Sequence, residues 1–106
     1  MYNLNQLFTS GIWVTKEGKE KDFVKEWEAF ANWSVRNKLG SQTPYLLQDI
    51  NNPRYSISFG PWPDLAIIEK WRQTKEFQAF VKKVKDLCEK LDPSTLKVVA
   101  LGKEKG

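Results

Sequence analysis

Two segments of the chain carry apolar side chains at intervals of three and four residues, the spacing of an amphipathic helix. The first begins after Gly18, and Gly40 follows its basic end, as is common beyond a helix C-terminus. Its stripe consists of Phe23, Trp27, Phe30, Ala31 and Ser34. The second segment is predicted to break around Arg72 to Thr74 into a short and a long helix, with Asp64 and Thr74 as N-caps. Its stripe is expected to end at Asp92 and Pro93, and consists of Phe77, Phe80, Val81, Val84, Leu87, Cys88 and Leu91.

Shorter segments have the composition of β-strands. They are Leu7 to Val14, Tyr45 to Gln48, Tyr55 to Phe59 and Leu96 to Leu101, and Gly60 and Pro61 are expected to end the third of them. The turn-forming residues at 49–53 predict a hairpin between the second and third strands. The order strand, helix, strand, strand, helix, strand predicts an α+β fold, the ferredoxin-like split βαβ, whose four-stranded antiparallel sheet carries both helices on one face.

The other face of this sheet is expected to meet something apolar. In the third strand Tyr55, Ile57 and Phe59 alternate with serines. The first and last strands carry apolar residues that point to both faces of the sheet. A second subunit and a ligand are the two candidates for covering that face, and we favour the subunit because two-fold homodimers are the commonest oligomers.

Composition narrows the class of protein further. With 106 residues the chain is predicted to be a single domain, residues 1–106, with a core at about 7–101 and a charged tail at 102–106. The net charge of +4 arises from lysines interspersed with glutamates, and Lys82, Lys83, Lys85 and Lys90 are expected to form a solvated helix face, so no nucleic-acid partner is predicted. The chain has one cysteine, no segment that resembles a signal peptide and no apolar run long enough to span a membrane, and we therefore expect a cytoplasmic protein. Cys88 is expected to be a small buried apolar residue.

The sequence contains no histidine, which excludes His-based triads and His metal sites. It also lacks cysteine pairs for zinc and a Gly-rich phosphate loop. Any enzymatic function must therefore work without the commonest catalytic groups and cofactor sites.

Particular motifs resemble those of one family. They are the Thr15 to Gly18 turn before Phe23 and Trp27, the strand end from Tyr45 to Asp49, and above all Ser58, Phe59, Gly60, Pro61, Trp62 followed by Trp71, Arg72 and Phe77. Together with the order of elements, they resemble the antibiotic biosynthesis monooxygenase family of the dimeric α/β barrel superfamily, over nearly the whole chain. The resemblance implies a homodimer whose two sheets face each other in a barrel, with a pocket in each subunit between its sheet and its helices.

The resemblance also implies a reaction that needs no metal or flavin. A phenolic, quinol or anthrone-like substrate loses a proton, and its anion reduces dioxygen directly. Trp62 and Trp71 would offer ring faces and indole donors, and Arg72 would offer a fixed positive charge. Trp13 and Phe59 complete the expected pocket, and Asp49 and Tyr45 are the candidate proton-transfer groups.

Simpler roles compete with these. Trp27, Phe30, Phe77 and Phe80 fit the core of the protein, Asp49 fits a turn-forming carboxylate, and Arg72 fits an ion pair or a surface position. Trp71 matches a tryptophan of the haem-degrading branch, but Val81 stands where that branch has its histidine, and Ser10 or Gly11 stands in place of its asparagine. Haem degradation is thus disfavoured.

Two other functions and one residue stay open. A non-catalytic dimeric protein that binds a small apolar ligand, or only dimerises, is the main alternative, and a lyase or isomerase is a third. Trp33 lies beside the Phe30 stripe and is expected to be half-exposed at a pocket mouth or at the dimer edge.

Overall fold

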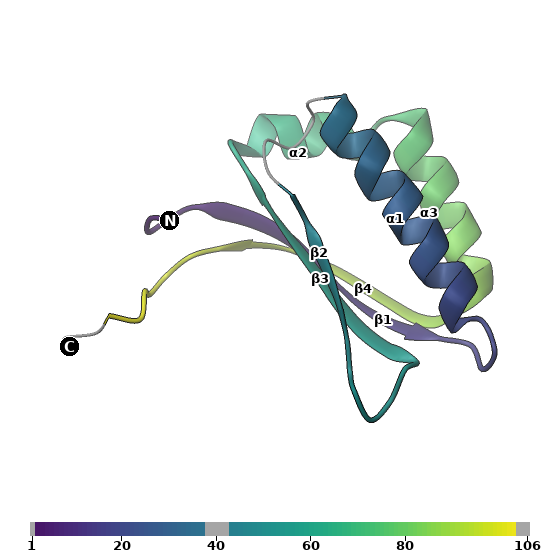
Figure 1. Cartoon of the computed structure of the whole chain (residues 1–106). Coiled ribbons are helices and arrows are strands. Elements are labelled where there is room, and N and C mark those ends of the chain that lie inside the picture. Colours follow the sequence, from purple (N-terminus) through teal and green to yellow (C-terminus); the bar gives the residue numbers. More distant parts are fainter. Residues whose placement is uncertain (1, 38–42, 104–106) are drawn as a thin grey trace.

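One antiparallel sheet with helices on a single face makes up the protein in this computed structural model, which describes residues 2–37 and 43–103 (Figure 1). The elements in chain order are β1 (Leu7–Thr15), α1 (Glu20–Arg36), β2 (Tyr45–Gln48), β3 (Tyr55–Trp62), α2 (Leu65–Arg72), α3 (Lys75–Leu87) and β4 (Cys88–Lys97). The four strands lie in the order β2-β3-β1-β4. This arrangement confirms the predicted ferredoxin-like α+β fold.

The helix starts follow from local capping. The Asp64 carboxylate accepts a hydrogen bond from the backbone N–H of Ile67 at 2.9 Å, and the Thr74 hydroxyl accepts one from Phe77 at 3.1 Å. Both predicted caps, and the break between α2 and α3, are therefore confirmed. Helix α1 ends at Arg36 with Asn37 as its C-cap, and the predicted stop at Gly40 lies outside the described residues.

Strand β3 continues through the predicted stop at Gly60 and Pro61, so that prediction is wrong. Pro61 pairs with Phe8 of β1, whereas the pairing of β2 with β3 begins at Tyr45 opposite Phe59. Pro61 therefore lies beyond the paired part of β2, where its missing N–H interrupts no ladder on that side.

The boundary between α3 and β4 also differs from the prediction. Helix α3 ends at Leu87, the residues from Cys88 onward are extended, and the strand ends at Lys97 rather than Leu101. Because β4 is an edge strand paired only with β1, Pro93 can lie inside it. Of the predicted tail, Gly102 and Lys103 are exposed and have no regular structure, and residues 104–106 lie outside the described part of the chain.

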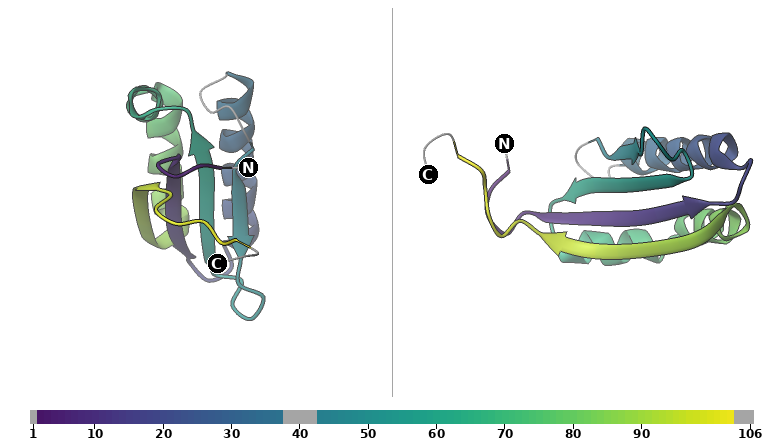
Figure 2. Two further views of the ribbon diagram at one scale, coloured as in Figure 1. Left: turned by 90° about the vertical axis from the view of Figure 1, so that its left-hand side faces the viewer. Right: turned by 90° about the horizontal axis from the view of Figure 1, so that it is seen from below.

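The two faces of the sheet differ in what covers them (Figure 2). Figure 2 shows the helices on one side and the other side bare. On the helix side Trp13 packs in a core cluster with Phe23, Phe80, Val84 and Cys88. Open-face side chains include Phe8, Phe59 and Tyr45, whose rings contact one another in sequence, and Tyr45 is 55% exposed. The open face is thus apolar, as predicted, along β1, β2 and β3. Strand β4 places one large apolar side chain, Leu96, on this face.

Within the described ranges, no helix has the length and apolar character needed to cross a membrane.

Candidate functional site

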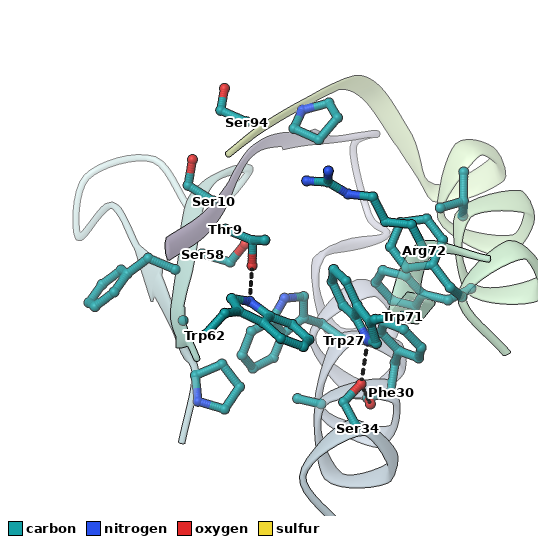
Figure 3. A pocket seen from close by; sticks show the side chains of 18 of the residues that line it. Thr9, Ser10, Trp27, Phe30, Ser34, Ser58, Trp62, Trp71, Arg72 and Ser94 are labelled. Carbon is teal, nitrogen blue, oxygen red and sulfur yellow. Dashed lines mark hydrogen bonds between the residues drawn. The ribbon is translucent and has the colours of Figure 1, made fainter. Parts of the chain in front are cut away.

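A cavity of about 650 Å³ lies between the helix side of the sheet and the helices (Figure 3). Strands β1, β3 and β4 and all three helices contribute to its lining, which is mostly aromatic and aliphatic. Its aromatic members on the helix side of the sheet and on the helices are Trp13, Trp27, Phe30, Trp62, Trp71, Phe77 and Phe80. The sequence predicted a pocket at this position between sheet and helices, with Trp13, Trp62, Trp71 and Arg72 in its wall, and the structure brings these four residues together.

The tryptophans that the sequence singled out donate their indole N–H groups to hydroxyls of neighbouring elements. These hydrogen bonds are Trp13 to Ser58 at 2.9 Å, Trp62 to Thr9 at 2.8 Å and Trp71 to Ser34 at 2.9 Å. The indole donors are therefore already used, contrary to the expectation that Trp62 and Trp71 would offer them to a ligand. What remains for a ligand is contact with their rings, of which Trp71 is half-buried and Trp62 is 5% exposed.

Gly11 makes the position of Trp13 possible. A Cβ atom at Gly11 would lie 2.8 Å from the Trp13 indole, closer than real Cβ contacts allow. The indole therefore lies over the bare backbone of its own strand, where its ring also contacts Phe23 and Phe80 at centroid distances of 5.1 and 6.0 Å. The glycine and the hydroxyl of Ser58 together fix this part of the cavity wall.

Trp62 and Trp71 form the pair that the sequence suggested. Their ring centroids are 4.7 Å apart, and Trp71 also contacts Phe77 at 4.7 Å and Phe30 at 5.6 Å. Four aromatic residues were expected to be plain core. Three of them are half-buried and form walls of the cavity, namely Trp27, Phe30 and Phe77, and the fourth, Phe80, belongs to the buried core cluster. Trp33 is half-buried, its ring centroid lies 5.8 Å from that of Phe30, and it does not line the cavity.

Arg72 supplies a half-buried positive charge to the cavity. Its side chain extends from the end of α2 toward β4 (Figure 3), where Nη2 donates to the Thr95 hydroxyl at 2.7 Å. The described residues place no carboxylate in an ion pair with Arg72, whereas Arg54 pairs with Glu89 at 2.7 Å. Of the two simpler roles expected for Arg72, an ion pair or a surface position, the ion pair is absent from the described structure, and most of the guanidinium donors stay available to a ligand.

Lys85 is the other titratable residue among the described residues that line the cavity. The sequence assigned it to the solvated face of α3, and although its side chain is exposed, it borders the cavity. Carboxylates, tyrosines and cysteines are absent from the described lining.

The remaining predicted site residues lie elsewhere. The Asp49 carboxylate accepts hydrogen bonds from the backbone N–H groups of Asn51 at 2.7 Å and Asn52 at 3.2 Å, which confirms its turn-forming role. Tyr45 does not line the cavity, and its ring lies on the open face, 5.6 Å from that of Phe59. Phe59 borders the cavity, but its ring makes its aromatic contacts on the open face. Cys88 is buried in the core as predicted, and burial raises the pKa of its thiol.

Fold and cavity together define a ferredoxin-like α+β protein with an aromatic pocket between its sheet and its helices. The family model of the antibiotic biosynthesis monooxygenases matches residues 12–83, and the chain belongs to this family. Searched against curated protein sequences, the chain matches none.

Solved structures share the fold at low sequence identity. A Pseudomonas aeruginosa protein is 19% identical with a TM-score of 0.77, over 94% of this chain and 100% of that one. SnoaB from Streptomyces nogalater, described as a cofactor-independent oxygenase, is 10% identical with a TM-score of 0.79, over 96% of this chain and 99% of SnoaB. A Shewanella oneidensis protein is 19% identical with a TM-score of 0.78, over 92% and 96% of the two chains.

Proposed function

We propose that this protein is a cofactor-independent monooxygenase that acts on a small aromatic substrate, namely a phenol, a quinol or an anthrone. Family membership supports the reaction type. The observation that carries the proposal is Arg72, a half-buried cation without an ion-pair partner among the described residues, in a cavity whose neighbouring walls are the ring faces of Trp62 and Trp71.

Arg72 acts on the ionisation of the substrate. A flat aromatic molecule packs against the faces of Trp62 and Trp71 and brings its hydroxyl or enol oxygen to the guanidinium. The positive charge stabilises the anion relative to the neutral form and lowers the pKa of the substrate, the more so because the cavity lining is mostly apolar. The Thr95 hydroxyl holds the guanidinium in place at 2.7 Å.

The anion then reacts with dioxygen without a further reductant. One electron passes from the anion to dioxygen, giving a substrate radical and superoxide, which combine to form a carbon–oxygen bond. The resulting peroxide takes up a proton, its O–O bond breaks as the remaining C–H proton leaves, and water departs. For an anthrone the balance is one CH₂ group and one O₂ molecule giving one carbonyl group and one H₂O molecule.

The proton of the substrate leaves to water. The described cavity lining offers no carboxylate, tyrosine or histidine to accept it, and Asp49 and Tyr45 point elsewhere. The pH dependence of kcat should therefore report the pKa of the bound substrate, shifted by Arg72, and should move when the substrate is changed.

The test is oxygen consumption with a panel of hydroquinones and anthrones in chelator-treated buffer. Arg72→Gln should lower kcat/KM about 10- to 100-fold, since it removes the charge that stabilises the anion. Arg36→Gln is the matched control, because Arg36 is exposed in the last turn of α1 and does not line the cavity. No turnover across the panel, or full activity of the Arg72 variant, would refute the proposal.

A non-catalytic binding protein is the second candidate, and the lack of a proton acceptor in the described lining favours it. It would bind the same aromatic molecules, with quenching of tryptophan fluorescence, but consume no oxygen. Binding across the panel without turnover would decide for this function.

We also propose that the protein is a homodimer and is cytoplasmic. A second copy would cover the open face, where Tyr45 is 55% exposed and Leu47 is 54% exposed, by two-fold packing of the two sheets. Sedimentation at micromolar concentration tests the dimer. A cytoplasmic location suits a chain whose one cysteine is a free thiol.

A further inference from the structure

We infer that the substrate carries, besides its reacting oxygen, an oxyanion that is charged at neutral pH, such as a carboxylate or a sulfonate, and that Lys85 binds this group at the end of the cavity away from Arg72. The inference rests on the proposed function, because it assigns the reacting oxygen to Arg72.

The position of Lys85 on its helix supports this role. Phe77, Val81 and Lys85 follow one another at intervals of four residues on α3, and all three line the cavity. They therefore form one stripe along the helix surface. Leu91, which pairs with Trp13 across the sheet, lines the same cavity from β4. The aliphatic part of Lys85 continues the apolar stripe, while its ammonium group reaches solvent at the cavity edge.

The charge of Lys85 has no counterpart in the cavity. The described lining contains two cationic side chains, Arg72 and Lys85, and no carboxylate. Among the described residues Lys83, two positions earlier on α3, pairs with Glu26 at 3.0 Å, and no ion pair forms at Lys85. An apolar cavity with a second uncompensated cation at its edge favours a ligand with a second negative charge.

The two cations are separated by most of the length of α3. Arg72 ends α2, and Lys85 lies ten residues after the first residue of α3, Lys75, so the rise along the helix is about 15 Å at ~1.5 Å per residue. With the two backbone positions this far apart, we expect a single oxyanion on a small ring to meet only one of the two cations. A fused aromatic framework with an acidic group remote from its reacting oxygen matches this separation.

The test compares aromatic ligands of similar size that differ in charge, among which the carboxylate and the amide also share a planar shape. Binding of 2-naphthoate, 2-naphthalenesulfonate and neutral 2-naphthamide is measured by quenching of tryptophan fluorescence. The two anions should bind about fivefold to tenfold more tightly than the amide, and added salt should reduce the difference. Lys85→Gln should remove most of this preference.

Lys82→Gln is the control, because it removes the same charge from an exposed position on α3 that does not line the cavity. It should leave the preference unchanged. Equal binding of the amide and the anions by the parent protein would overturn the inference. So would a preference that survives Lys85→Gln and is lost in Arg72→Gln, since the oxyanion would then bind at Arg72.

Oxygen consumption separates this inference from the proposed function. Lys85→Gln should raise KM for acidic quinols about fivefold and leave KM for neutral quinols unchanged. Turnover with the same KM for acidic and neutral quinols would contradict the oxyanion site and uphold the oxygenase. Charge-selective binding that depends on Lys85, with no turnover of any quinol, would uphold the site and contradict the oxygenase.

Discussion

Replacing Ser58 by alanine should destabilise the protein through Trp13 rather than through Ser58 itself. Trp13 is 6% exposed, Ser58 is 8% exposed, and the indole Nε1 donates to the serine Oγ at 2.9 Å. Ser58→Ala removes the acceptor and leaves a buried N–H without a partner, which costs about 1–3 kcal/mol. A loss of about 2 kcal/mol corresponds to a Tm lower by roughly 8–16 °C in a domain of this size.

Ser56 provides a matched control on the same strand. It faces the same side of the sheet two residues earlier and is 1% exposed, but its hydroxyl makes no hydrogen bond within the described residues. Ser56→Ala should therefore change the free energy of unfolding by less than about 0.5 kcal/mol. Both variants are measured by urea unfolding at one fixed protein concentration, because dimerisation would make the midpoint depend on concentration.

A double-mutant cycle assigns the cost to the hydrogen bond. Trp13→Phe removes the N–H donor and keeps an aromatic ring, so Ser58→Ala in that background should cost little, with a coupling free energy of about 1–2 kcal/mol. A Ser58→Ala variant no less stable than Ser56→Ala, or one equally destabilised in the Trp13→Phe background, would show that the hydroxyl does not hold the indole.

Other variants test separate parts of the structure. Gly11→Ala should push the Trp13 indole into the cavity, because the new Cβ would lie 2.8 Å from it, and urea unfolding should show a loss of about 1–3 kcal/mol; parental stability would contradict the packing. Phe59→Asp should give a monomer in sedimentation, since it places a carboxylate among the open-face rings; a dimer that persists would exclude this face as the interface. Burial raises the pKa of Cys88 above its ordinary value of 9.0, so its contribution to stability is present below pH 9 and falls as the pH rises beyond it. Cys88→Val should remove this decrease in stability above about pH 9. A pH profile of stability equal to that of the parent protein would show that Cys88 does not cause the decrease.

Local signals in the sequence were sufficient for much of the fold. Asp64 and Thr74 were found as caps because each side chain bonds the backbone only three residues away. The start of β4 was missed because Cys88 and Leu91 fit both periodicities: they continue the helical stripe of α3, and they also face Thr15 and Trp13 across the sheet. Nothing local to Pro93 shows that its strand is an edge, which depends on the order of the whole sheet.

The candidate site was predicted through its large residues and missed in its small ones. Trp62, Trp71 and Arg72 stand out in composition, whereas the hydroxyls of Thr9, Ser34 and Ser58 belong to common residue types. Their bonds to indoles join positions between 37 and 53 residues apart, which no local pattern reveals. One signal was available, because the serines of β3 alternate with bulky apolar residues and so indicate a polar row beneath the helices.

The most direct test of the account is a turnover experiment under ¹⁸O₂ with a hydroquinone or anthrone, in chelator-treated buffer and with protein of measured metal and flavin content. We predict product in which one oxygen atom comes from dioxygen, formed at a rate that is independent of residual metal and flavin and is lowered in Arg72→Gln but not in Arg36→Gln. Product without the label, a rate that follows the residual metal or flavin content, or equal rates in the two arginine variants would contradict it.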